Sequence, residues 1–305
     1  MADKSKVRLS KKQIELIADK FKPVADQAKD IGLKFVAVGR TGVGKSSTVN
    51  SLLGEQIAPV GHFERLTATV EEYNASLQGI PCTISDTPGF CDEKAEKNTD
   101  QAYLNLLISK VPEFHCMLFV TQLNFSRVDG CEKNIISNIS TALGVEVWSH
   151  SVVVFTHSND QLPQSFSDVL KKRTQLIRDC IAESAGSEIA SGIPTIAVDN
   201  LYTKNPDGKP WLPQLYMGIL RRIRQEALVG YVIATGLERI DLNEEDLAEV
   251  RSSVESDETF KVGLASIYFG VGPGVVIGAA IGGPIGGAIG AILGPLIAGK
   301  IFESD

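Results

Sequence analysis

The chain has 305 residues, of which 43% are hydrophobic and 22% are charged, and its formal net charge is −7. This length and composition exclude a disordered chain and a small secreted module built on disulfides. The five cysteines contain no C-x-x-C pair, which argues against a disulfide framework or a zinc ribbon and favours a reducing compartment. A strongly basic footprint is absent, so we expect no nucleic-acid partner.

Residues 1–30 are predicted to form an N-terminal amphipathic helix. Ser10 and Gln13 have the spacing of a capping box, in which each side chain satisfies a free amide at the helix start. Apolar residues then recur every three or four positions from Ile14 to Ile31, which places them along a narrow seam on one helix face. We expect this helix to pack on the flank of the domain that follows.

Residues 31–228 alternate apolar runs with helical segments, which predicts an α/β domain. The expected strands cover residues 34–38, 69–77, 82–85, 115–121, 151–155 and 195–198, and the expected helices cover residues 45–53, 100–109, 129–143, 166–184 and 213–228. Residues 78–81 have the composition of a hairpin turn between the second and third strands. The remaining alternation predicts a mostly parallel sheet with helices on both faces.

A candidate phosphate-binding loop follows the first expected strand. Residues 39–46 read G-x-x-x-x-G-K-S and open the next expected helix, so backbone amides there can bind phosphate oxygens. Lys45 would reach the β- and γ-phosphates, and Ser46 would bind Mg²⁺. The expected nucleotide-binding residues of this loop are Gly39, Arg40, Thr41, Gly42, Val43, Gly44, Lys45, Ser46 and Ser47.

The segment Asp86-Thr-Pro-Gly89 ends the third expected strand. Asp86 can hold the Mg²⁺ shell, and the amide of Gly89 can contact a γ-phosphate, a combination that favours a switch GTPase over a generic ATPase. A threonine between the two motifs should also reach the metal. Thr67 is our choice because it lies just before the second strand, and Thr69 is the alternative inside that strand.

The expected base-binding segment departs from the usual N-K-x-D signature. After the fifth strand the sequence is Phe155-Thr-His157-Ser-Asn159-Asp160. His157 replaces the lysine and could pack its ring against the base. A carboxylate normally accepts from guanine, and here either Asn159 or Asp160 could read the base. Asp199 and Asn200, after the last strand, are placed to contact the far edge of the base.

Together these motifs resemble those of the AIG/GIMAP and chloroplast-envelope Toc GTPases, the septin-related branch of P-loop GTPases. The resemblance is carried by residues 39–54, 86–90, 121–123, 127–129 and 155–157. It implies a G domain that binds GTP and GDP with Mg²⁺ and hydrolyses GTP slowly. It also implies nucleotide-dependent formation of a homodimer or higher oligomer across the site, and attachment to a membrane through the C-terminal part.

The catalytic set within one chain looks incomplete. Phe90 stands where many GTPases place the glutamine that orients the attacking water, and a phenylalanine cannot do this. Arg127 resembles the arginine that Toc-type GTPases offer across the dimer, so Arg127 and Thr67 are the expected catalytic residues. The alternative is that Arg127 is a surface arginine paired with Asp129.

The C-terminal part begins with an acidic stretch, residues 229–261, expected to be a helical connector. Residues 262–299 then carry no charge, and glycines at every fourth position from 270 to 294 form a stripe that suits close helix packing in lipid. We expect residues 262–305 to insert in a membrane, with the G domain facing the cytosol. At about 1.5 Å per residue the uncharged run exceeds a ~30 Å hydrocarbon core. The segment could cross the membrane as one tilted span or fold back as a hairpin. The alternative to membrane insertion is a buried glycine-rich helical pair inside a soluble oligomer.

The sequence therefore predicts a membrane-anchored GTPase whose partners are guanine nucleotide, a membrane and a second copy of the chain. One rival hypothesis is a scaffold that binds GTP on membranes and barely hydrolyses it. Another is a membrane-perforating effector that the G domain gates. Turnover with and without dimerisation would separate the first rival, and liposome leakage would detect the second.

Overall fold

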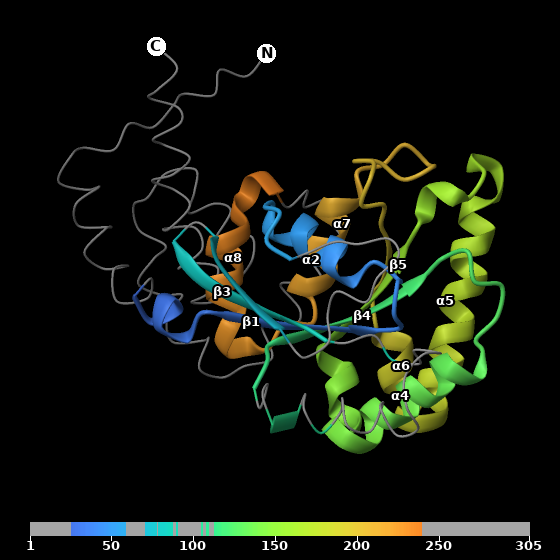
Figure 1. Ribbon diagram of the computed structural model, residues 1–305, viewed down its shortest axis with the longest axis horizontal. Coiled ribbons are helices and arrows are strands. Elements are labelled where there is room, and N and C mark those ends of the chain that lie inside the picture. The colour runs from blue at the N-terminus through green and yellow to red at the C-terminus, as the bar shows by residue number, and fades with distance from the viewer. Residues whose placement is uncertain are drawn as a thin grey trace, which may run out of the picture. The chain divides into compact units, whose positions relative to one another are not determined.

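A computed structural model describes residues 26–58, 71–77, 79–87, 90, 105, 108–109 and 113–239 (Figure 1). Most of the predicted N-terminal helix, most of the helix predicted at 100–109 and the whole uncharged tail lie outside these residues. The chain divides into two compact units, one formed by residues 33–77 and 81–224 and the other by residues 1–32, 78–80 and 225–305. No helix in the described ranges combines the length and the apolarity needed to cross a bilayer.

The first unit is built on a six-stranded sheet with the order β2-β3-β1-β4-β5-β6. The strands are β1 (Leu33–Gly39), β2 (Glu71–Leu77), β3 (Ile80–Asp86), β4 (Cys116–Gln122), β5 (Ser151–Thr156) and β6 (Thr195–Ala197). β3, β1, β4, β5 and β6 pair in parallel along this order. Only residues 78–79 connect β2 to β3, which permits an antiparallel hairpin but no parallel crossover. The predicted α/β class and mostly parallel sheet are confirmed.

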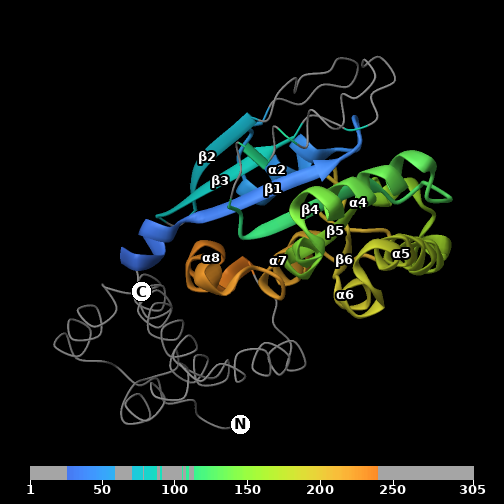
Figure 2. The same cartoon turned by 90° about the horizontal axis from the view of Figure 1, so that it is seen from below.

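Helices cover both faces of this sheet. They are α2 (Lys45–Leu53), α4 (Gly130–Leu143), α5 (Pro163–Ala185), α6 (Ser187–Gly192) and α7 (Trp211–Leu220), with short 3₁₀ helices η1 (Val145–His150) and η2 (Ser158–Asp160). α4, α5 and α6 gather beside the β4–β6 part of the sheet (Figure 2). α7 lies against α2, where the Tyr216 hydroxyl donates to the Leu52 carbonyl at 3.1 Å. The second unit contains α8 (Gln225–Arg239) and a helical turn at residues 26–31.

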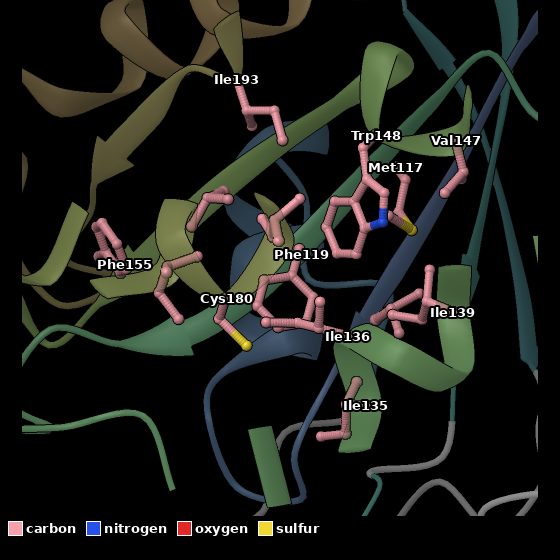
Figure 3. Close-up of a cluster of buried hydrophobic side chains, with 14 of the residues drawn as sticks. Met117, Phe119, Ile135, Ile136, Ile139, Val147, Trp148, Phe155, Cys180 and Ile193 are labelled. Carbon is pink, nitrogen blue, oxygen red and sulfur yellow. The ribbon is translucent and has the colours of Figure 1, made fainter. Parts of the chain in front are cut away.

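One side of the sheet packs with α4 and α5 into a large apolar core (Figure 3). Successive residues of β1 and β4 are buried, because helices cover both faces and neither alternate set meets water. Phe119 meets Trp148 edge to face at 5.6 Å between ring centroids, and the Trp148 indole donates to Ser140 at 2.8 Å. Burying each such large side chain contributes roughly 1.5–3 kcal/mol. This core holds rigid the strand ends that carry the candidate site.

The predicted helix over residues 213–228 is wrong as a single element. α7 ends at Leu220 and α8 begins at Gln225. Between them the amide of Arg224 donates to the carbonyl of His115 at 2.9 Å, and the Arg224 guanidinium donates to the carbonyl of Phe114 at 3.0 Å. These long-range bonds divert the backbone from the helical pattern, which local periodicity could not reveal. The hairpin turn is also shorter than predicted, because Ile80 and Pro81 belong to β3.

The cysteines fall into two groups. Cys82, Cys116 and Cys180 are free and buried, and burial raises the pKa of the Cys82 thiol to about 12. Cys131, at the start of α4, is disulfide-bonded, and its partner lies outside the described residues. The sequence argument was against a disulfide framework, and Cys131 is the one disulfide-bonded cysteine among those described. Cysteine counting and spacing do not reveal such a bond.

Candidate functional site

The loop between β1 and α2 needs glycine for its backbone conformation and for its close approach to β4. Gly42 and Gly44 lie in the left-handed region, with φ of +77° and +93°. A side chain on Gly39 would meet the carbonyl oxygen of Val120 at 2.1 Å, so β4 leaves room only for glycine there. Gly44 also gives no side-chain cap to α2. Amides at such a helix start are the donors that bind phosphate oxygens.

Lys45 lies beneath this loop and is only 7% exposed. Its ammonium donates to the carbonyls of Gly39 at 3.3 Å and Arg40 at 3.0 Å. These carbonyls hold the charge inside the curve of the loop, beside the amides that would bind phosphate. The structure thus places the lysine where the P-loop pattern requires a cation.

Ser46 and Asp86 meet at the mouth of the same loop. The Ser46 hydroxyl donates to Oδ2 of Asp86 at 2.5 Å, and Oδ1 of Asp86 is buried without a hydrogen-bond partner in the described part of the chain. Burial raises the pKa of Asp86, and the opposing effects of Lys45 and Ser46 do not cancel that rise. An unused carboxylate oxygen beside a hydroxyl is the oxygen donor set that Mg²⁺ takes together with substrate phosphates. Ser46 and Asp86 therefore fit a magnesium ion.

The segment after Asp86 is tied to the phosphate loop by its backbone. The Phe90 amide donates to the Gly39 carbonyl at 3.2 Å, and the Thr41 amide donates to the Phe90 carbonyl at 3.3 Å. The Phe90 ring is fully buried in the core, so it cannot face a water at the phosphate. Gly89 and Thr67 lie outside the described residues, and their predicted roles stay predictions.

His157 begins the predicted base-binding segment in a left-handed conformation, with φ of +58°, and it is the one described non-glycine residue with positive φ. The Thr156 hydroxyl donates to the Val43 carbonyl of the phosphate loop at 2.6 Å. Nδ1 of His157 lies 3.0 Å from the same hydroxyl. Because that hydroxyl has given its proton to Val43, the imidazole nitrogen is the donor to it. Thr156 thus links the base-binding segment to the phosphate loop, a role that the sequence reasoning missed.

The other three predicted base-binding residues have protein partners. The Asn159 amide nitrogen Nδ2 donates to the Lys204 carbonyl at 3.0 Å, and Oδ2 of Asp160 accepts from Asn124 at 3.1 Å. Asn200 is turned to α2, where it accepts from Ser51 and donates to Thr48. Asn159 and Asp160 lie in η2 after β5, and Asn200 lies on the loop after β6, where α2 holds its side chain.

Asp199, which the sequence reasoning placed with Asn200 at the far edge of the base, organises these loops. Its buried carboxylate accepts from the backbone amide of Asn159 at 3.1 Å through one oxygen. Its other oxygen accepts from the amides of Leu201 and Tyr202. Asp-Asn directly after a strand is a signal for such a turn, in which the aspartate side chain binds the amides two and three residues on.

Arg127 is exposed on the loop between β4 and α4. The alternative pairing with Asp129 is not found, because Oδ2 of Asp129 binds the Arg40 guanidinium at 2.6 Å. Oδ1 of Asp129 caps α4 by accepting from the Glu132 amide at 2.9 Å. Burial alone would raise the pKa of Asp129, but the Glu132 amide and the Arg40 charge outweigh it and hold the pKa below its usual value.

A model of the AIG1 family matches residues 33–190, which is just over half of the chain. The chain belongs to the AIG1 family. The match spans the phosphate loop, Asp86, Arg127 and the His157 segment, so the predicted resemblance is confirmed.

Several curated proteins are similar to this AIG1-family chain. GTP-binding protein A of Dictyostelium discoideum is 37% identical over 134 residues, which cover 43% of this chain and 29% of that protein. Translocase of chloroplast 34 of Arabidopsis thaliana is 29% identical over 204 residues, which cover 60% of this chain and 63% of that protein. The chain thus spans less than two thirds of either relative.

Solved structures of Toc33 from Arabidopsis thaliana share the fold. Toc33 in complex with GDP and Mg²⁺ has a TM-score of 0.53 and 24% identity, covering 74% of this chain and 94% of that one. A dimerisation-deficient arginine-to-alanine mutant of Toc33 has a TM-score of 0.56 and 22% identity, covering 75% and 93%. Toc33 has also been solved with GMPPNP and Mg²⁺. At these identities the likeness establishes the fold.

Proposed function

We propose that this AIG1-family chain binds GTP and GDP with Mg²⁺ and hydrolyses GTP. The observation that carries the proposal is the convergence of Lys45, Ser46 and Asp86 at one loop, with an unpartnered carboxylate oxygen on Asp86. The ligands in the Toc33 structures, GDP or GMPPNP with Mg²⁺, support this assignment. When bound, Mg²⁺ would neutralise charge that develops on the phosphates.

Within this site each residue has a separate task. The amides of residues 40–46 orient the phosphates, and the Lys45 ammonium offsets their charge. Ser46 and Asp86 hold the metal shell, and Thr67 is proposed to complete it. His157, together with Asn159 or Asp160, binds the base. Phe90, at the position where many GTPases place a water-orienting glutamine, is buried in the core and cannot orient a water.

We propose that Arg127 of a second copy supplies the additional positive charge that hydrolysis needs at the phosphate end. Arg127 is exposed and makes no ion pair within the described residues, so its guanidinium is available to a partner. A study of Toc33 and Toc159 states that dimerisation is important for their GTPase activity, which supports a shared site. We therefore propose slow turnover in the monomer and faster turnover in the dimer.

The test is GTP turnover per chain, measured from low to high protein concentration. We expect the parent rate to rise with concentration, whereas Arg127→Ala stays at the low rate of the monomer and binds GDP like the parent. Ser126→Ala, an exposed neighbour of Arg127, is the matched control and should behave like the parent. A parent rate independent of concentration would contradict the shared site.

The proposal places the chain on a membrane through residues 262–305, with the G domain facing the cytosol. The uncharged, glycine-striped sequence of this segment supports it. Deleting residues 262–305 should move the protein from the membrane pellet to the supernatant and leave GDP affinity unchanged, because the candidate site lies before residue 205. Pelleting of the truncated chain would assign the anchor to another segment.

A second candidate is a scaffold that binds GTP and barely hydrolyses it. Burial of Phe90 favours this function, because a buried phenylalanine cannot take the place of the water-orienting glutamine. In that case dimerisation would depend on GTP while turnover stayed at the monomer rate at every concentration. The concentration series described above separates the two functions.

A further inference from the structure

We propose that Arg40 couples the phosphate loop to the loop of residues 124–129, and that Phe125 is the residue that positions Arg127 on that loop. The inference rests on the proposed function, in which Arg127 acts on a second copy. It adds a route by which the nucleotide bound in one chain determines the position of Arg127, the arginine that this chain offers to the second copy.

Arg40 contacts both Lys45 and the segment that follows Asp86, the two parts of the site proposed to respond to the nucleotide. Its carbonyl accepts from the Lys45 ammonium at 3.0 Å. Its backbone forms an isolated bridge with Phe90, directly after the segment that begins at Asp86. A γ-phosphate that draws Lys45 or the Asp86 segment toward itself therefore displaces the backbone of Arg40 as well.

The side chain of Arg40 reaches out of the phosphate loop to the loop of residues 124–129. Its guanidinium binds Asp129 at 2.6 Å, and its Cζ lies 5.5 Å from the centre of the Phe125 ring. Asp129 in turn caps α4. The ion pair is short and the cation–π contact lies within the ~6 Å range of such contacts, so a displacement of Arg40 is carried to the loop and to the start of α4.

A second guanidinium fixes the loop from the core. Arg173 lies on α5, is 1% exposed, and pairs with Glu132 at 2.5 Å. It also donates to the Thr121 hydroxyl at 3.1 Å. Its Cζ lies 5.7 Å from the centre of the same Phe125 ring. Phe125 therefore contacts one arginine that the core holds still and another that belongs to the phosphate loop.

Arg127 lies midway between the two anchored positions, two residues after Phe125 and two before Asp129. Its side chain is exposed, whereas its neighbours on both sides are held by Arg40. The position of Arg127 thus depends on contacts that it does not make itself. Phe125 and Asp129 are positioning residues, because neither is assigned to touch the nucleotide.

The first experiment tests the position of the loop through Phe125. Phe125→Leu keeps the apolar bulk and removes the ring face, and we expect it to weaken dimerisation in the presence of GMPPNP by roughly tenfold. Phe125→Tyr keeps the ring face and should dimerise like the parent. GDP affinity of the monomer should be unchanged in both variants. Combining Phe125→Leu with Arg127→Ala should weaken dimerisation no further than Arg127→Ala alone.

The second experiment tests the coupling through Asp129. Asp129→Asn retains an oxygen that can cap α4 and removes the charge that pairs with Arg40. We expect the ratio of dimer affinities with GMPPNP and with GDP to shrink roughly three- to tenfold, while Ser126→Ala leaves it unchanged. Parent-like dimerisation of Phe125→Leu and Asp129→Asn, with Arg127→Ala still defective, would overturn the coupling and leave the proposed function standing. Parent-like dimerisation of Arg127→Ala would overturn both.

Discussion

The phosphate end and the base end of the candidate site are built in different ways. At the phosphate end the binding groups are mainly backbone amides, fixed by glycines, together with Lys45 and Asp86 that burial holds in place. At the base end they are side chains, and Asn159, Asp160 and Asn200 each already have a protein partner. The phosphate end is preorganised, whereas the proposed base-binding residues would have to exchange protein contacts for contacts with the base.

This difference has an energetic consequence. Asp86 leaves one buried carboxylate oxygen unpartnered, so the free protein carries an unfavourable charge that a metal can relieve. The hydrogen bonds of Asn159 and Asp160 instead stabilise the free protein. Ligand binding should therefore draw most of its favourable energy from the phosphates, and base selectivity should be the smaller term.

The largest effect is expected from a substitution that removes a binding group at the phosphate end. Lys45→Ala removes the buried cation that the loop holds beside the phosphates, so we expect GDP affinity to fall about 100-fold or more. Titration calorimetry with Mg²⁺ measures it. Lys171→Ala, an exposed lysine on α5, is the matched control and should bind like the parent. An unchanged GDP affinity in Lys45→Ala would refute the P-loop assignment.

A second change tests whether the buried charge on Asp86 is unfavourable without ligand. The pKa of Asp86 is raised in the folded protein, so the protonated carboxyl favours folding. This contribution is fully present at pH below the ordinary value of 3.8 and is lost as the pH rises through the raised pKa. At neutral pH, Asp86→Asn should thus stabilise the free protein, on the order of 1 kcal/mol. Addition of Mg²⁺ and GDP should raise the melting temperature of the variant less than that of the parent.

The exposed aspartate Asp168 provides the control for that experiment. Asp168→Asn should leave both the free protein and its response to Mg²⁺ and GDP as in the parent. A destabilised Asp86→Asn variant with a normal response to Mg²⁺ would show that the carboxylate is structural. Thermal melts at neutral pH with and without ligand are sufficient to decide.

A smaller effect is expected from the base end. Asp160→Ala or Asn159→Ala should reduce the preference for GDP over ADP by roughly 10-fold, the value of one charge-assisted or buried hydrogen bond. The residue whose removal lowers the preference is the one that reads the base. Preference unchanged in both variants would move base recognition to His157 and the backbone.

The smallest expected effect concerns Asp129 and its pH dependence. Because its folded pKa is lowered, Asp129 contributes stability above its ordinary value of 3.8, and this is lost as pH falls through the lowered pKa. The side chain is 44% exposed, so solvent screening keeps the contribution small. Urea unfolding of the parent and Asp129→Asn should differ at pH 6, and the difference should shrink as the pH falls below 3.8. A difference that stays constant as the pH falls would contradict the ionic account.

The sequence predicted the parts of this protein that backbone geometry dictates. Strand β1, the G-x-x-x-x-G-K-S loop and the helix that begins at Lys45 form one local sequence pattern. The position of Asp86 beside this loop could be predicted because Asp86 ends β3, the parallel neighbour of β1. Helix bounds could not be predicted where long-range contacts decide them, as at Arg224 between α7 and α8.

Side-chain pairing across the fold could not be predicted in the same way. The contacts of Arg40 with Asp129 and Phe125 join positions about 90 residues apart, and no spacing rule connects them. Asn200 was predicted to reach the base, but nothing in its sequence neighbourhood indicated that Ser51 and Thr48 of α2 would bind it. Several rotamers of such a residue suit the same backbone, and the tertiary neighbours choose among them.

The central claim is that this fold binds guanine nucleotide. The most direct test is competition on the full chain, with fluorescent GDP bound in the presence of Mg²⁺ and displaced by unlabelled GDP, GTP, ADP or ATP. The account predicts that GDP and GTP displace it at concentrations at least about 10-fold lower than ADP and ATP, as expected for one or more hydrogen bonds to the base. Displacement by ADP and ATP at the same concentrations as GDP and GTP would contradict it.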